Sequence, residues 1–114
     1  MNILITGGAG FLGRGLANAL LERGQLAGRD IDRLMLADLV APQEAALVDD
    51  PRVSVSTGDL LAHVPALMAA GPWDAVFHLA SAVSGECEVN FDLGLHANLD
   101  STRALLDACR EQTA

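Results

Sequence analysis

The chain has 114 residues, 51% of them hydrophobic, with 15 acidic residues against seven basic ones and a formal net charge of −8. All seven bases are arginine, and neither lysine nor tyrosine occurs. Schiff-base chemistry, a tyrosine general acid and a P-loop lysine are therefore excluded within these residues. The length predicts one domain over residues 1–114, and the hydrophobic content is sufficient for a packed core.

The charge and the cysteines predict a soluble protein that does not bind nucleic acid. Phosphate binding requires clustered basic residues, whereas the arginines are scattered from Arg14 to Arg110. Cys87 and Cys109 form no Cys-x-x-Cys motif and are interpreted as buried or half-buried thiols in a reducing compartment. The N-terminus lacks the basic region of a signal peptide, and no apolar stretch approaches the ~18 residues of a membrane span. We therefore expect a cytoplasmic protein with no membrane partner and no metal site.

The chain is expected to begin with a buried strand followed by a helix. Ile3, Leu4 and Ile5 form a short apolar run, typical of a strand buried on both faces in a parallel sheet. A helix is expected from about Gly10 to Gly24, because glycine favours helix termination. Residues 24–32 are rich in turn formers and are interpreted as a loop. The predicted apolar face of the helix comprises Leu12, Leu16, Ala19 and Leu20.

Three further strands are expected after this loop. Residues 34–37 form a second buried strand that ends at Asp38, and residues 42–50 contain a single helical turn. The alternation of residues 53–57 predicts a strand with one solvated face, at an edge of the sheet. A short helix is expected over residues 63–70. Residues 75–80 form an apolar run typical of a central strand, which lies at an exposed edge if no fifth strand follows.

A long helix is expected over residues 91–110, with an apolar repeat formed by Leu95, Leu99, Thr102, Leu106 and Cys109. Four strands thus alternate with helical segments, which predicts an α/β fold. Right-handed crossovers then give a doubly wound, Rossmann-type parallel sheet with strand order 3-2-1-4, ending before a fifth strand. This order places the alternating strand at one edge.

The strongest motif is Thr6-Gly7-Gly8-Ala9-Gly10-Phe11-Leu12-Gly13, which follows the first strand and opens an amphipathic helix. Gly7 allows a tight turn with positive φ, Gly10 lets backbone N–H groups approach a pyrophosphate, and Gly13 lets the helix pack closely. The helix N-terminus adds donors and a partial positive charge, which matters because Arg14 is the only cation that the loop offers. The alternative is a glycine-rich turn without a ligand.

Acidic residues end the second and third strands. Asp38 follows Gly13 by 25 positions, where a carboxylate can accept both hydroxyls of an adenosine ribose and repel a 2′-phosphate, so NAD is favoured over NADP. Leu39 is assigned to the same cofactor site. Asp59 can bond the adenine amino group while Leu60 packs on the ring. The alternatives are an ordinary strand-end acid at Asp38 and a turn-forming one at Asp59.

The fourth strand ends next to the glycine loop. Leu79, Ala80 and Ser81 follow it, and small residues there leave room for a cofactor across the carboxyl edge of the sheet. His78 lies between Phe77 and Leu79. It is interpreted as a buried histidine with satisfied hydrogen bonds rather than as a general base.

With these motifs the whole chain resembles the extended short-chain dehydrogenase/reductases, the NAD-dependent epimerase/dehydratase family. The resemblance implies an NAD site in which each strand end has a role. The pyrophosphate is held by Gly7, Gly10, Phe11, Leu12 and Gly13, the adenosine ribose by Asp38, and the adenine by Asp59 and Leu60. Leu79, Ala80 and Ser81 line the path to the nicotinamide. Asn98, in Asn98-Leu99-Asp100-Ser101-Thr102, lies near the cofactor or fixes the local backbone.

Residues 80–86 and 91–94 carry a narrower resemblance, to the D-erythronate dehydrogenase subgroup of this family. That subgroup oxidises a four-carbon sugar acid with NAD, and the resemblance implies that Ser81, Ser84 and Glu86 face the substrate. The alternative is that these three residues form a polar loop that caps the next helix.

The chain departs from the family in one respect that matters for catalysis. The family's reaction uses a Tyr-x-x-x-Lys pair, and neither residue type occurs here. The 114 residues are therefore expected to be the amino-terminal, cofactor-binding part of a longer dehydrogenase or epimerase/dehydratase that acts on a small sugar or sugar acid. No catalytic residue is expected within them, and the catalytic pair is expected beyond Ala114.

Two other interpretations of the 114 residues stay open. The chain is either an NAD-binding module that catalyses nothing or a remnant without a ligand. The family also implies a homodimer formed through the last helix.

Overall fold

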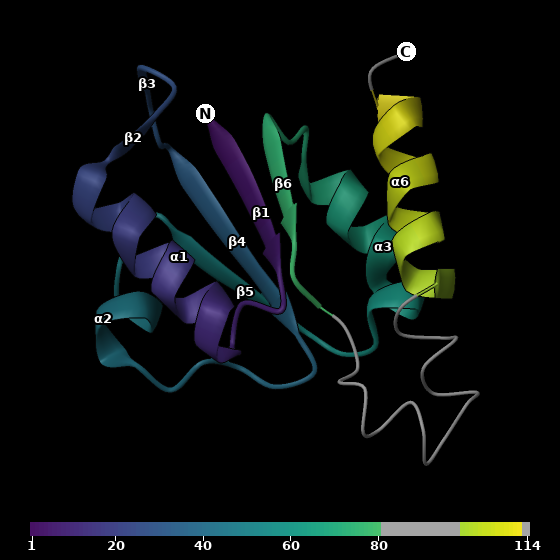
Figure 1. Ribbon diagram of the computed structural model, residues 1–114, viewed down its shortest axis with the longest axis horizontal. Helices are drawn as coiled ribbons and strands as arrows, with labels where there is room; N and C mark the ends of the chain where they lie inside the picture. Colours follow the sequence, from purple (N-terminus) through teal and green to yellow (C-terminus); the bar gives the residue numbers. More distant parts are fainter. Residues whose placement is uncertain (81–98, 113–114) are drawn as a thin grey trace.

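The computed structural model describes residues 1–80 and 99–112. Its main sheet is parallel and contains β1 (Asn2–Thr6), β4 (Arg33–Asp38), β5 (Val53–Thr57) and β6 (Ala75–His78), in the spatial order β5-β4-β1-β6. Taken in chain order these are the first to fourth strands, so the predicted order 3-2-1-4 is confirmed (Figure 1). In the described chain, β5 and β6 form the two edges, as predicted.

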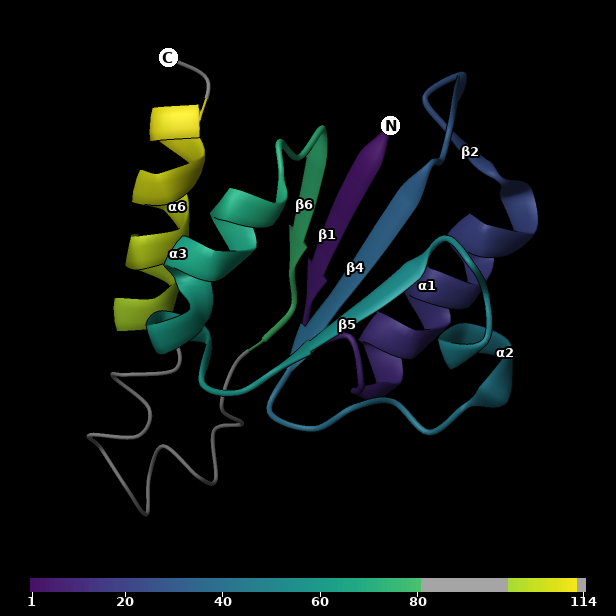
Figure 2. The same ribbon diagram turned by 180° about the vertical axis from the view of Figure 1, so that it is seen from behind.

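Helices cover both faces of this sheet, as Figures 1 and 2 show from opposite sides. On one face, α1 (Phe11–Arg23) and α2 (Ala45–Val48) pack against β1 and β4 in a core that includes Ile3, Ile5 and Leu36. On the other face lie α3 (Leu60–Ala70) and α6 (Ser101–Gln112), whose core includes Leu4 and Leu105. Successive residues of β1 therefore enter opposite cores, because side chains alternate along a strand.

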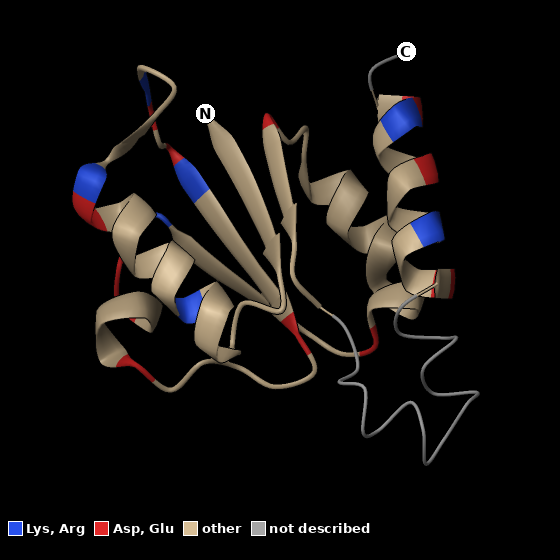
Figure 3. Ribbon diagram, in the orientation of Figure 1, with Lys and Arg blue, Asp and Glu red and all other residues tan. Residues whose placement is uncertain are grey.

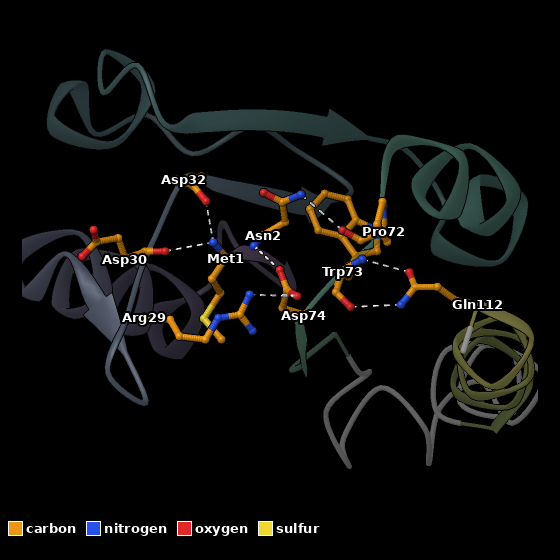
Figure 4. Close-up of polar contacts among 9 residues, drawn as sticks. All are labelled: Met1, Asn2, Arg29, Asp30, Asp32, Pro72, Trp73, Asp74 and Gln112. Atoms are coloured by element: carbon orange, nitrogen blue, oxygen red, sulfur yellow. Dashed lines mark hydrogen bonds and ion pairs between the residues drawn. The ribbon is translucent and has the colours of Figure 1, made fainter. Parts of the chain in front are cut away.

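The amino ends of the strands are joined by polar contacts (Figure 4). The Met1 ammonium donates to the Asp32 carboxylate at 2.5 Å, and the backbone N–H of Asn2 donates to the Asp74 carboxylate at 2.6 Å. Trp73 and Gln112 exchange two hydrogen bonds of 2.9 Å, which ties the end of α6 to the segment before β6. This network lies at the edge of the sheet opposite the glycine loop.

The predicted loop over residues 24–32 is wrong in part. After α1, which ends at Gly24 as predicted, β2 (Gln25–Leu26) and β3 (Arg29–Asp30) form a small antiparallel hairpin. Its two turn residues, Ala27 and Gly28, both have positive φ, at 52° and 77°. Two-residue hairpin turns of this kind favour asparagine, aspartate or glycine at their first position. Ala27 occupies that position, so the sequence did not predict the hairpin.

The predicted apolar faces of two helices are confirmed only in part: Leu20 is buried, and Leu16 and Cys109 pack against the core. The residues of α1 that are buried are Gly13, Ala17 and Leu20, whereas Leu12 is 70% exposed and Ala19 is exposed. Two of the three buried positions are taken by small residues, because α1 packs closely on the glycine turn and the sheet. In α6 the buried residues are Ser101 and Leu105, and the leucines of the predicted repeat at positions 99 and 106 are exposed.

Several element bounds also differ from the predictions. The helix expected over residues 63–70 begins at Leu60, so that Asp59 takes the N-cap position. β6 ends at His78 rather than at residue 80. The last helix ends at Gln112 rather than at Arg110. Its predicted start at residue 91, together with Leu95, lies outside the described residues, as does Ala114 beyond its end.

Candidate functional site

The glycine turn joins β1 to α1 at the carboxyl edge of the sheet. Gly7, with φ of 76°, and Gly8 donate their N–H groups to the Ala37 carbonyl at 2.7 and 3.2 Å. Gly10 donates to the Gly7 carbonyl at 3.1 Å and begins α1 without a side-chain cap. The turn is therefore fixed to the end of β4, and the start of α1 receives no side-chain acceptor from its cap residue.

Two glycines of the motif are required by backbone packing. A Cβ at Gly13 would lie 2.1 Å from the Gly7 carbonyl oxygen, and a Cβ at Gly7 would lie 2.8 Å from the Leu79 carbonyl carbon. Gly13 thus packs against the glycine turn itself. A Cβ at Gly10 would meet only the Gly7 oxygen, at 3.4 Å. Phe11 and Leu12 follow with 83% and 70% exposure.

Asp38 lies directly against the glycine turn. One carboxylate oxygen accepts the Ala9 N–H at 2.9 Å and the other accepts the Leu39 N–H at 2.7 Å. The Asp38 carbonyl accepts the Gly58 N–H at 2.9 Å, which joins the end of β4 to the end of β5. The structure therefore brings together the glycine loop and the acidic residue that the sequence separates by 25 positions.

The remaining predicted residues lie along the same edge. Asp59 is exposed at the N-cap position of α3, and Leu60 is partly buried against the core beneath α3. Leu39 is 70% exposed and Leu79 is 37% exposed. Ala80 follows Leu79 and lies against Gly7. The other residues singled out in the sequence lie outside the described residues: Ser81, Ser84, Glu86, Cys87 and Asn98.

Arg14 is held by a network that the sequence did not reveal. Its guanidinium donates to Glu44 at 2.9 Å, and the other Glu44 carboxylate oxygen accepts from Asn18 at 3.0 Å. These residues line an open hollow of about 350 Å³ beside α1. Because Arg14 and Glu44 are 30 positions apart, no local pattern signals the pairing. The cation expected to serve the glycine loop is thus already paired with an acid.

Comparison with known proteins shows the family to which the chain belongs. Residues 3–114 match the model of the NAD dependent epimerase/dehydratase family. The chain belongs to this family. The family resemblance read from the glycine loop, from Asp38 and from Asp59 is thereby confirmed.

Individual members of the family resemble the chain closely. D-erythronate dehydrogenase from Cupriavidus necator is 56% identical over 97% of the chain, and the chain spans 35% of that relative's length. Among solved structures, the nucleoside-diphosphate-sugar epimerase from Agrobacterium tumefaciens is 39% identical with a TM-score of 0.82, over 95% of the chain and 32% of its own. A uronate dehydrogenase variant from Agrobacterium tumefaciens, in complex with NAD, is 29% identical with a TM-score of 0.72, over 96% of the chain and 36% of its own.

The chain thus spans about a third of the length of these family members. The expectation that it corresponds to one part of a longer enzyme agrees with this coverage. The position of the catalytic pair, expected beyond Ala114, stays a prediction, since Ala114 is the last residue of the sequence and lies outside the described residues.

His78 is a satisfied histidine, as predicted. Its Nδ1 lies 2.6 Å from the Thr6 hydroxyl and its Nε2 lies 2.6 Å from the Thr102 hydroxyl. Burial lowers the pKa of the imidazole, because a low-dielectric environment disfavours the charged form. Burial similarly raises the pKa of the Cys109 thiol, which is half-buried.

Neither a metal cluster nor a membrane-spanning helix is found in the described part of the chain. Among residues 1–80 and 99–112, no three histidine, cysteine or carboxylate side chains gather closely enough to hold a metal ion. No helix within those ranges has the length and apolar character needed to cross a membrane. The arginines are spread over α1, the hairpin, β4, the turn before β5 and α6, with acids among them (Figure 3). The predictions on nucleic acid and on compartment remain predictions.

Proposed function

We propose that the chain binds NAD along the carboxyl edge of the sheet and supplies the cofactor site of an NAD-dependent oxidoreductase acting on a hydroxyl group of a sugar or sugar acid. The observation that carries this proposal is the 2.9 Å bond from the Ala9 amide to the Asp38 carboxylate. It holds the acid at the end of β4 against a glycine turn that opens a helix, and dinucleotide sites use an acid in this arrangement to bind the ribose. Family membership supports the same cofactor.

Each part of the cofactor has proposed partners at this edge. The pyrophosphate lies over the start of α1 and is held by Gly7, Gly10, Phe11, Leu12 and Gly13. Asp38 holds the adenosine ribose, with Leu39 beside it, and Asp59 and Leu60 hold the adenine. Leu79, Ala80 and Ser81 lead to the nicotinamide, with Asn98 near the cofactor. NAD is preferred because Asp38 repels a 2′-phosphate, and because Arg14 is already paired with Glu44.

The proposed substrate is D-erythronate, with Ser81, Ser84 and Glu86 facing it. The 56% identity to a D-erythronate dehydrogenase supports this choice. The second candidate is a nucleotide-sugar epimerase or dehydratase, which the 39% identical epimerase structure favours. Both reactions require a Tyr-x-x-x-Lys pair beyond Ala114, because neither residue type occurs in the sequence. By itself the 114-residue chain is therefore proposed to bind NAD without reducing it.

Calorimetry with NAD and NADP on the 114-residue chain tests the cofactor proposal. NAD is expected to bind about tenfold or more tightly than NADP, since repulsion of a charged group at a site built for hydroxyls costs about 1–3 kcal/mol. Asp38→Ala is expected to remove most of this preference, whereas Asp107→Ala, at an exposed acid on α6, is the matched control. No binding of either nucleotide at millimolar concentration would contradict the proposal. A preference for NADP would overturn the role of Asp38.

The chain is also proposed to form a homodimer through α6. On this helix Leu106 is 64% exposed, and Leu99, just before it, is 56% exposed. Apolar side chains exposed in this way favour a self-association surface. Sedimentation velocity on the wild type and on Leu106→Glu tests this proposal, and a wild-type chain that stays monomeric at high concentration would contradict it.

A further inference from the structure

The buried hydroxyl of Thr6 fixes the tautomer of His78. Thr6 is fully buried at the end of β1, and its Oγ1 accepts the N–H groups of Leu79 at 3.1 Å and Ala80 at 3.3 Å. A hydroxyl oxygen has two acceptor sites and one proton. Because both acceptor sites face backbone N–H groups, the hydroxyl proton is donated to Nδ1 of His78. The other ring nitrogen, Nε2, then carries the proton and donates to Thr102.

The backbone that Thr6 holds is one wall of the glycine turn. A Cβ at Gly7 would lie 2.8 Å from the Leu79 carbonyl carbon and 2.9 Å from the Ala80 nitrogen. The Leu79 N–H is shared between the Thr6 carbonyl, at 3.0 Å, and the Thr6 hydroxyl. Any shift of residues 79–80 would therefore change the backbone contact between the glycine turn and the segment that follows β6.

The outer end of the same chain of bonds lies on α6. Thr102 is in the first turn of that helix, which packs through Leu105 against Leu67 of α3 and Leu4 of β1. The His78 ring is thus bonded on one side to the central strand and on the other to the helix that covers this face. Through Thr6, it connects α6 to the backbone amides of Leu79 and Ala80, which lie against Gly7.

We propose that His78 is a positioning residue of the cofactor site: held as the neutral Nε2–H tautomer between Thr102 and Thr6, it sets the backbone of Leu79 and Ala80 against the glycine turn. This inference rests on the proposed NAD function, because it assigns these two residues to the nicotinamide side of that site. Both ring nitrogens of His78 are bonded to hydroxyls of the chain itself, so neither is directed toward a ligand. Its effect reaches the ligand through the backbone of residues 79–80.

Thr102→Val tests this relay, the chain of hydrogen bonds from Thr102 through His78 to Thr6. The side chain changes little in shape, because valine replaces the hydroxyl by a methyl group. Thr6 still requires an acceptor at Nδ1, so the tautomer is kept, but the Nε2–H group loses its partner on α6. The ring is then anchored on one side only, and it holds the Thr6 hydroxyl less firmly. Hydrogen exchange of the Leu79 and Ala80 amides is expected to rise about tenfold, and NAD affinity to fall about tenfold, as expected for loss of one buried hydrogen bond. Thr102→Ser restores the hydroxyl and is expected to behave as the wild type in both respects.

The matched control is Arg103→Val, which places the same β-branched residue at the next, exposed position of α6. It introduces valine into the same helical turn without touching His78, and its loss of helix propensity is larger than that of Thr102→Val, because threonine and valine have similar propensities. Changes in exchange and in NAD affinity that occur in Thr102→Val and not in Arg103→Val support positioning. Equal exchange at Leu79 and Ala80 in the two variants would overturn it.

Two readouts on the wild type separate this inference from the proposed function. Nitrogen chemical shifts of the His78 ring near neutral pH are expected to show the Nε2–H tautomer, and an Nδ1–H or doubly protonated ring would overturn the relay whether or not NAD binds. If the relay is found but the wild type binds no NAD, the proposed function fails, and with it the role of His78 toward a cofactor. If the wild type binds NAD and Thr102→Val binds it equally well, only the positioning role is overturned.

Discussion

Gly13 and Gly15 lie two positions apart in α1, and substitution of each by alanine is expected to change stability in opposite directions. A Cβ at Gly13 would lie 2.1 Å from the Gly7 carbonyl oxygen, 2.8 Å from the Gly7 carbonyl carbon and 2.9 Å from the Gly8 Cα. The first distance is about 1.3 Å short of the 3.4 Å at which ordinary contact begins. All three atoms belong to the backbone, so no side-chain rotation can relieve the overlap.

The helix has little room to move away from the turn. Ala17 and Leu20, on the same face of α1, are 0% and 4% exposed, so a shift at Gly13 would be transmitted into the core. Overpacking of this kind costs about 1–3 kcal/mol or more, while the helix propensity of alanine returns up to about 1 kcal/mol. We expect Gly13→Ala to lower the free energy of unfolding by about 2 kcal/mol and to abolish NAD binding.

Gly15 provides the matched control. It is exposed in the same helix, and a Cβ there would meet no atom within 4 Å. Gly15→Ala is expected to raise the free energy of unfolding by about 0.5–1 kcal/mol, because alanine loses less backbone entropy in a helix. Urea unfolding followed by circular dichroism measures both values. The packing argument is refuted if Gly13→Ala is as stable as the wild type, or if the two variants shift in the same direction by similar amounts.

Three further predictions address the ligand and the titratable groups. Gly10→Ala meets only an ordinary contact of 3.4 Å, so stability is expected to change little while NAD affinity falls about tenfold or more; calorimetry finding unchanged affinity would count against the pyrophosphate role. The pKa of His78 is lower in the folded chain than its ordinary value of 6.5, so the folded state favours the neutral ring. The stabilisation that this ring gives is therefore complete above pH 6.5 and is lost as pH falls through the pKa of the folded state. The difference in unfolding free energy between the wild type and His78→Asn should accordingly shrink from about pH 7 to about pH 5. Bonds from Arg52 lower the pKa of Asp50 to about 2, so Asp50→Asn should cost about 1 kcal/mol or less above pH 3.8, with the cost lost as pH falls through about 2; a pH-independent difference would contradict this.

The sheet could be predicted from the sequence because its signals are local. Each strand is a short apolar or alternating run ended by turn formers, and the handedness of crossovers then restricts the order of four parallel strands to very few arrangements. The same reasoning found Asp38, since its position at a strand end is fixed by the strand itself. Fold and cofactor edge therefore follow from residues that lie next to one another in the chain.

What could not be predicted depends on distance in space. Hydrophobic periodicity correctly selected Leu20 of α1, but close packing on the glycine turn gives the other two buried positions of this helix to Gly13 and Ala17. The bond from Arg14 to Glu44 spans 30 positions, and the bond from Thr6 to His78 spans 72. No repeat or spacing in the sequence predicts such pairs, because these contacts form only when the crossovers bring distant segments of the chain together.

The contacts of Asp38 explain how one carboxylate can serve the free chain and a bound dinucleotide. Each oxygen accepts one backbone N–H, from Ala9 and from Leu39. An ionised carboxylate offers about four acceptor positions, so about two remain for the ribose hydroxyls without release of the glycine turn. An asparagine at this position keeps one acceptor oxygen, and its amide nitrogen would face one of the two N–H donors. A carboxylate therefore has two separate advantages here: it holds the glycine turn through the Ala9 N–H, and it retains the acceptors that the proposed ribose contact needs.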